Sequence, residues 1–183
     1  TTLLKQLLLD HIDEEIEHAK AGRPAQIWAK VNSVVDPGII DALYDASMAG
    51  VKIDLVVRGI CCLRAGVPGL SDNIRVRSVI GRFLEHSRVF YFRCGEDESL
   101  YLSSADWMNR NMLRRVELAW PINDPVLRQR IIDECLVAYL HDTANAWSLQ
   151  ADGNYIDLAK GSAPPERLVP APRGTTRMPC SWQ

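Results

Sequence analysis

The chain has 183 residues, a formal net charge of −2, and apolar and charged contents of 47% and 24%. These ordinary values exclude wholesale disorder, collagen and coiled coil. The length predicts one domain, and no apolar run approaches the ~20 residues of a membrane helix. The acidic, amphipathic start is unlike a signal peptide. Because the chain begins with Thr1 and not Met, we expect a fragment of a longer protein.

The first half of the chain predicts a strand–helix–strand unit. Apolar spacing and turn residues predict helices over 2–21 and 37–49 and strands over 27–35 and 51–57. The second helix has Asp36 as N-cap, Pro37 in its first turn and Gly50 at its end. The unit implies a parallel strand pair, so Arg58 should lie at the carboxyl edge, where α/β sheets bind ligands.

The second half predicts further strands and one long helix. The expected elements are a loop over 59–73, strands over 74–80, 84–92, 100–104 and 115–120, a turn over 95–99, a helix over 124–141, and hairpin strands over 147–150 and 155–158. Period-two alternation puts His86 and Arg88 on the same face of their strand. Residues 160–183 contain five of the ten prolines, so we expect a domain over 1–159 and a disordered or foreign tail.

Charge is unevenly distributed along the chain. Residues 1–22 carry two Lys and five acids, whereas residues 58–95 carry seven Arg and two acids, a local balance of +5. Guanidinium groups bind phosphate or carboxylate oxygens in pairs, which suggests an anionic ligand. A solvated basic face is the alternative. The five cysteines include no CxxC pair and favour reduced, structural thiols in a cytosolic protein.

His86 is the strongest candidate for chemistry, because it lies within this arginine-rich segment. An imidazole can serve as nucleophile or as acid and base on phosphoryl groups, and nearby arginines would stabilise the transferred charge. A histidine satisfied within the core is the alternative. Ser103 and Ser104 could bind phosphate or form an ordinary turn. Glu117 could orient the imidazole or pair with Arg115; Arg110 and Arg114 add positive charge nearby.

Three runs, VRGICCLR, GRFLEHSR and LSSADWMNRN, together resemble the last catalytic domain of bacterial polyphosphate kinases of the long-chain-synthesising type. The resemblance extends over residues 3–158. It implies an α/β fold like that of phospholipase D, with a mixed, largely parallel sheet flanked by helices. It also implies reversible transfer of the terminal phosphate of ATP to polyphosphate, with Mg²⁺ held by residues of upstream domains and no metal ligand in this chain.

The resemblance assigns roles to particular residues. His86 matches a histidine that faces the phosphorylated histidine of the preceding domain, and Arg58 matches an arginine that contacts nucleotide phosphates. Supporting positions would be Arg88, Ser103, Ser104 and Glu117. The implied partners are ATP, polyphosphate and the upstream domains of the same polypeptide, in a homo-oligomer without nucleic acid. The implied location is the cytoplasm, with association to the inner membrane as an option.

The sequence departs from the phospholipase D signature in two places. That signature is HxK followed by four residues and an Asp, but here it is His86-Ser87-Arg88 and then Arg93. Its Gly-Ser-x-Asn is replaced by the segment 103–106. With one histidine motif, we expect the chain to be inactive alone. Two alternatives stay open: a phospholipase D-like phosphodiesterase that works as a dimer, and a non-catalytic polyanion-binding module.

Overall fold

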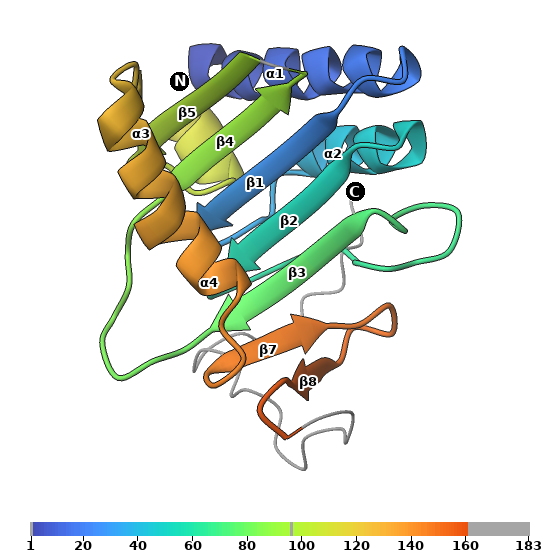
Figure 1. Cartoon of the computed structure of the whole chain (residues 1–183), viewed down its shortest axis with the longest axis vertical. Coiled ribbons are helices and arrows are strands. Elements are labelled where there is room, and N and C mark those ends of the chain that lie inside the picture. Colours follow the sequence, from blue (N-terminus) through green and yellow to red (C-terminus); the bar gives the residue numbers. More distant parts are fainter. Residues whose placement is uncertain (1, 96, 161–183) are drawn as a thin grey trace.

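The computed structural model describes residues 2–95 and 97–160, in which one eight-stranded sheet is covered by helices on both faces (Figure 1). The predicted tail lies outside the described residues beyond Lys160. The strands are β1 (Ala25–Val31), β2 (Lys52–Val57), β3 (Ile74–Val79), β4 (Val89–Cys94), β5 (Asp97–Ser103), β6 (Ala119–Pro121), β7 (Ala146–Leu149) and β8 (Tyr155–Asp157). The helices are α1 (Thr2–Lys20), α2 (Pro37–Ala49), η1 (Arg110–Arg114), α3 (Pro125–Ile131), η2 (Ile132–Val137) and α4 (Ala138–Leu140). Among these helices, none is long and apolar enough to cross a membrane.

The sheet has the strand order β6-β5-β4-β1-β2-β3-β7-β8. Only the pairs β1–β2 and β2–β3 are parallel, and the other five neighbouring pairs are antiparallel. The mixed α/β sheet flanked by helices is therefore confirmed, but its largely parallel character is wrong. The reason is that β4 pairs antiparallel with β1, and β7 pairs antiparallel with β3. Further antiparallel strands then extend the sheet on both sides.

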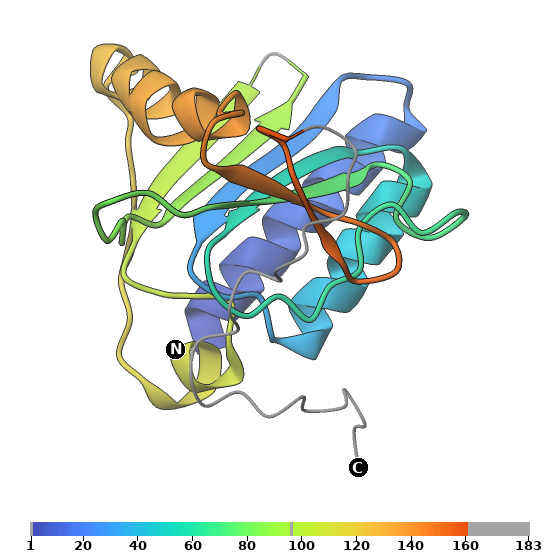
Figure 2. The ribbon, with the colours of Figure 1, turned by 90° about the horizontal axis from the view of Figure 1, so that it is seen from below.

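Helices α1 and α2 cover one face of the sheet, and the continuous helical segment α3–η2–α4 crosses the other (Figures 1 and 2). The first face holds the main apolar core, with Leu8, Ile12 and Leu43 almost fully buried. The second face holds a smaller cluster: Val89, Tyr91, Leu100, Ile132 and Leu136. The predicted helix over 124–141 is confirmed in position, although its middle third is widened to i→i+5 bonding.

The best-predicted element is α2, whose bounds match the expected 37–49. Its cap is also as expected, because Asp36 Oδ1 accepts a hydrogen bond from Ile39 N at 3.1 Å. Gly50 ends the helix with a φ of +100°, a left-handed conformation that favours glycine. The short β7–β8 hairpin is confirmed as well.

Three predicted strands are shorter than expected. Strand β4 begins at Val89 rather than at residue 84, because β1 ends one residue after Lys30, the partner of Val89. Beyond Val31 the segment 84–87 has no β1 residue to pair with, and His86 lies in a loop. Residues 32–35 leave β1 and instead bond to the chain near Ile60 and Trp107. Strand β6 pairs only over three residues.

Candidate functional site

The carboxyl ends of β1 and β2 meet the amino end of β4 and the carboxyl end of β5 at one edge of the sheet, at the lower left of Figure 1. Each element delivers a polar side chain within three residues of this end. Asn32 follows β1, Arg58 follows β2, and the segment containing His86 and Arg88 precedes β4. Asp106 comes three residues after β5. The fold thus gathers residues that are up to 74 positions apart.

These five side chains form a closed ring of contacts, here called the His86 ring. Arg58 donates from Nε and Nη2 to Asn32 Oδ1, at 3.2 and 2.8 Å. Asn32 in turn donates from its backbone N and from Nδ2 to Asp106, at 2.7 and 3.3 Å. Arg88 closes the ring by donating from Nε and Nη2 to the same carboxylate, at 3.0 and 2.9 Å. The two guanidinium groups are therefore held by one asparagine and one aspartate.

The imidazole of His86 lies between the two guanidinium groups. Its Nδ1 is 3.4 Å from Arg58 Nη2, and its Nε2 is 3.3 Å from Arg88 Nη2. A neutral imidazole has one acceptor nitrogen, so it accepts from only one arginine at a time. The side chain is exposed at the sheet edge. An exposed imidazole flanked by two cations is suited to an anionic ligand.

The pair Arg88–Asp106 is buried, with side-chain exposures of 12% and 7%. Burial by itself would raise the pKa of Asp106, but hydrogen bonds from Arg88 and Asn32 outweigh it and hold that pKa below its usual value. The carboxylate therefore stays ionised, and its two-point contact with Arg88 fixes the plane of the guanidinium. Arg88 is in this way a fixed part of the site.

Gly59 permits a close approach of two strand ends. Its backbone N donates to Asn32 O at 2.7 Å, and a Cβ on Gly59 would lie 2.7 Å from that same oxygen. Any larger residue would have to displace the backbone of Asn32. The glycine after Arg58 is therefore required by the packing that places Asn32 in the His86 ring.

The predicted supporting residues divide into two groups. Arg88 lies in the ring, whereas Ser103 and Ser104 fasten a bend to the chain before β6. Ser103 is buried and donates to Leu118 O at 2.8 Å. Ser104 donates to Glu117 Oε2 at 2.5 Å and accepts from Leu118 N. Their hydroxyl groups thus bind the protein itself and hold the turn that leads to Asp106.

Glu117 lies just before β6 and not within a strand as expected. Its two carboxylate oxygens accept hydrogen bonds from Ser104 and from Asn111 Nδ2 at 2.5 Å. The expectation that Glu117 orients the His86 imidazole through a hydrogen bond is therefore wrong for this conformation. Both ring nitrogens of His86 face arginines instead. Glu117 orders the loop around η1 instead.

Neither thiols nor carboxylates form a metal site in the described part of the chain. In residues 2–95 and 97–160, no group of three or more His, Cys, Asp or Glu side chains could hold a metal ion. Asp106, the carboxylate nearest His86 in the ring, is taken up by Arg88 and Asn32. Asp106 is therefore not free to bind a metal ion in this conformation. Burial raises the pKa of the Cys61 thiol to about 12, as expected of a structural cysteine.

Two residues of the His86 ring, Asn32 and Asp106, were not predicted as site residues from the sequence. Asn32 had no assigned role, and Asp106 was noted only as part of a replaced signature. Asn32 was expected inside the strand over 27–35, whereas β1 ends at Val31 and leaves Asn32 at the carboxyl edge, where ligand-binding residues concentrate. Its partner Asp106 is 74 residues away, and no local pattern links the two.

Comparisons with known proteins give a consistent set of similarities. The profile of the family "Polyphosphate kinase C-terminal domain 2" matches residues 1–167. Curated polyphosphate kinases of Neisseria meningitidis and Pseudomonas aeruginosa are 55% and 60% identical over 156 residues, which is 85% of this chain. The chain spans only 23% and 22% of the length of these relatives.

Solved structures give the same result. A polyphosphate kinase from Porphyromonas gingivalis superimposes with a TM-score of 0.81 at 42% identity, over 89% of this chain and 25% of that one. A phospholipase D family member, Nuc from Salmonella typhimurium, gives a TM-score of 0.53 at 16% identity, over 80% of this chain and 90% of that one. The second similarity shows the shared fold alone.

Proposed function

Since the chain belongs to the polyphosphate kinase family as its C-terminal domain 2, we propose that it supplies one wall of the active site of an ATP:polyphosphate phosphotransferase. The proposed reaction is the reversible transfer of the terminal phosphate of ATP to inorganic polyphosphate. One observation carries the proposal: the His86 ring presents an exposed imidazole between two fixed guanidinium groups.

In this proposal Arg58 contacts the phosphate directly. Its Nε and Nη2 are oriented by Asn32, and among the described residues none accepts a hydrogen bond from its Nη1. A phosphoryl group in transfer spreads negative charge over its three equatorial oxygens. A preorganised guanidinium stabilises that charge without reorganising during the reaction. Arg88, already held by Asp106, contributes charge and fixes the opposite side of His86.

His86 would act on the transferred group as acid, base or charge stabiliser. It would face the nucleophilic histidine and the Mg²⁺ ligands supplied by upstream domains, with ATP and polyphosphate bound between the domains. We extend the proposal to a homo-oligomeric, cytoplasmic enzyme.

The open alternatives receive less support. In a phospholipase D-like phosphodiesterase, the position of Arg88 is a lysine, but here the guanidinium is bound at two points by a buried carboxylate. A polyanion-binding module would use the same arginines, Arg58 and Arg88 among them, with His86 in a structural role, but the His86 side chain is exposed. Phosphoryl-transfer assays on the chain and on a chimera separate these functions.

The test is phosphoryl transfer from ATP to polyphosphate, measured on two proteins. One is this chain alone, and the other is a chimera in which it replaces the matching segment of the Pseudomonas aeruginosa relative. We expect no turnover by the chain alone and clear turnover by the chimera. His86→Ala should lower chimera turnover by about 10²–10³-fold.

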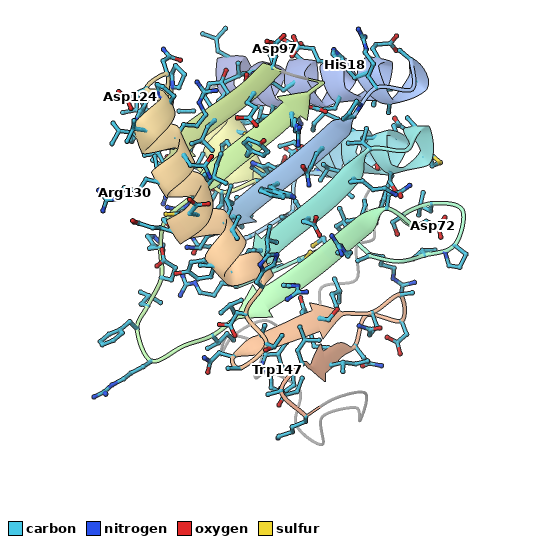
Figure 3. The ribbon with its side chains drawn as sticks, in the orientation of Figure 1. His18, Asp72, Asp97, Asp124, Arg130 and Trp147 are labelled. Carbon is cyan, nitrogen blue, oxygen red and sulfur yellow. The ribbon has the colours of Figure 1, made fainter. Side chains whose placement is uncertain are left out.

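A matched control is His18→Ala, since His18 lies at the other end of the strands from the His86 ring (Figure 3). It should leave turnover unchanged. Turnover by the chain alone, or phosphodiester cleavage by it, would contradict the proposal. Salt-dependent polyphosphate binding that is indifferent to His86→Ala, together with an inactive chimera, would instead favour the polyanion-binding module.

A further inference from the structure

A buried lysine lies on the second face of the sheet, beside the loop that carries His86. Lys30 of β1 is only 4% exposed. Its Nζ donates to Ser87 Oγ at 2.7 Å, lies 3.0 Å from Glu85 Oε1, and lies 3.7 Å from the centroid of the Tyr139 ring. A buried ammonium is costly unless it is paired, and these three neighbours offset part of the cost. Burial still holds the pKa of Lys30 below its usual value, against the hydrogen bond and charge of Glu85.

Two of the three neighbours of Lys30, Glu85 and Ser87, are the residues on either side of His86 in the sequence. The carboxylate of Glu85 accepts from Ser87 N at 2.9 Å and from Ser87 Oγ at 2.6 Å. Its other oxygen accepts from Tyr139 Oη at 2.9 Å. The hydrogen bonds from Ser87, with those from Lys30 and Tyr139, hold the pKa of Glu85 far below its usual range despite partial burial. Glu85 is thus a permanent anion at the base of the loop.

This network anchors a loop that has little else to order it. The preceding residues Phe83 and Leu84 are 83% and 77% exposed. Among the described residues, the imidazole of His86 has hydrogen-bond contacts with the two arginines alone. The backbone on both sides of the imidazole is therefore fixed from below by β1 and by α4, the helix that carries Tyr139.

We propose that Lys30 and Tyr139 are positioning residues, which hold Glu85 and Ser87 and thereby keep the His86 imidazole between Arg58 and Arg88. The inference rests on the proposed function, because it assigns these residues to the same phosphoryl transfer. Neither residue touches the substrate. Their effect is on the geometry of the reacting group, where displacement by about 1 Å can cost about 10²-fold in rate.

The test uses the active chimera with Tyr139→Phe, which removes one hydroxyl, and Lys30→Met, which removes the charge. We expect kcat to fall about tenfold and about 10²-fold, respectively, the range typical of groups that orient a reacting residue. The KM for ATP should stay within about twofold, because Arg58 and its Asn32 partner are untouched. The control is Lys5→Met, which breaks the 2.7 Å pair of Lys5 in α1 with buried Asp36, the N-cap of α2, on the opposite face of the sheet from Lys30.

The comparison with Lys5→Met separates positioning from general loss of stability. Turnover is measured well below each variant's thermal transition, so that all variants are folded. If Lys30→Met and Tyr139→Phe retain the kcat of Lys5→Met, or raise KM without lowering kcat, the positioning role is wrong. If His86→Ala also retains turnover, the proposed function itself fails. If His86→Ala is inactive while Tyr139→Phe and Lys30→Met are fully active, only this inference fails.

Discussion

The two faces of the sheet are built on different principles. The face under α1 and α2 is a continuous apolar core, with residues such as Ile27, Leu43 and Leu55 fully buried. The face under α3–η2–α4 has a smaller apolar cluster and places a charged network around Lys30 beside the site. Apolar burial stabilises without direction, whereas hydrogen bonds and ion pairs fix geometry. The first face thus holds the sheet together, and the second face orders the reactive loop.

We expect the largest effect on turnover from removing the His86 imidazole. His86→Ala removes the imidazole but no core packing, so turnover of the chimera should fall by about 10²–10³-fold. The thermal midpoint should change little, because the side chain is exposed. Turnover and melting are measured on the same preparation. A large loss of stability would show that His86 belongs to the fold and not to the chemistry.

A pair of equivalent truncations compares the faces. Leu43 and Leu136 are both fully buried, one on each side of the sheet. Each change to alanine should lower the free energy of unfolding by about 2–5 kcal/mol, measured by denaturant titration. At a temperature where both are folded, only Leu136→Ala should lower turnover of the chimera, since it loosens the helix that carries Tyr139. Equal turnover in both variants would remove the distinction.

The ion pair between Asp106 and Arg88 should make the stability of the domain depend on pH. Asp106→Asn removes the charge that pairs with buried Arg88 and should cost about 2 kcal/mol at pH 7. Because the folded-state pKa of Asp106 lies below its usual value of about 3.9, its stabilisation is complete above that pH and is lost as the pH falls further. The difference between wild type and variant, measured by unfolding at several pH values, should therefore shrink below about pH 4.

A matched control for that prediction is Asp54→Asn. Asp54 is also a buried carboxylate, paired with Arg75 at 2.6 Å, but the arginine is 73% exposed. The pair lies near the amino ends of β2 and β3, whereas the His86 ring lies beyond the carboxyl end of β2. We expect a smaller loss of stability and unchanged turnover. Equal effects of the two variants on turnover would mean that Asp106 has no special role.

The smallest effect is expected on the outer surface of the second face. Arg130 pairs with Glu134 at 2.8 Å on the helical segment, and both side chains are well exposed (Figure 3). Arg130→Gln should change neither the thermal midpoint nor turnover measurably. A clear loss of turnover would show that this helix acts through its outer surface as well as through Tyr139.

Local signals predicted the first part of the fold well. The bounds of α2 follow from Asp36, Pro37 and Gly50, because capping and left-handed termination depend on neighbouring residues. The strand over 84–92 was too long, since alternation alone cannot show where β1, its partner, ends. Likewise, the strand–helix–strand pattern implied one parallel pair, β1 and β2, but the antiparallel return of β4 and β7 depends on the whole sheet.

The site was predicted only in part, because some of its residues have local signals and others depend on long-range contacts. Arg58 and His86 were found through the end of a strand, the arginine excess and the family motifs, and the structure brings them within 3.4 Å. Asn32, Asp106 and Lys30 took their roles from partners 26 to 74 residues away. Contacts at such separations leave no periodicity or spacing in one sequence, so only the three-dimensional fold reveals them.

The ends of the sheet have a consequence for how this domain behaves beside other chains. Both outermost strands, β6 and β8, are three residues long, and β6 ends in Pro121, which has no N–H to donate. A long exposed edge invites another chain to add a strand, and such addition leads to aggregation. Here each border offers little backbone for that purpose. Within residues 2–95 and 97–160, both borders of the sheet are therefore poor templates for the addition of a strand from another chain.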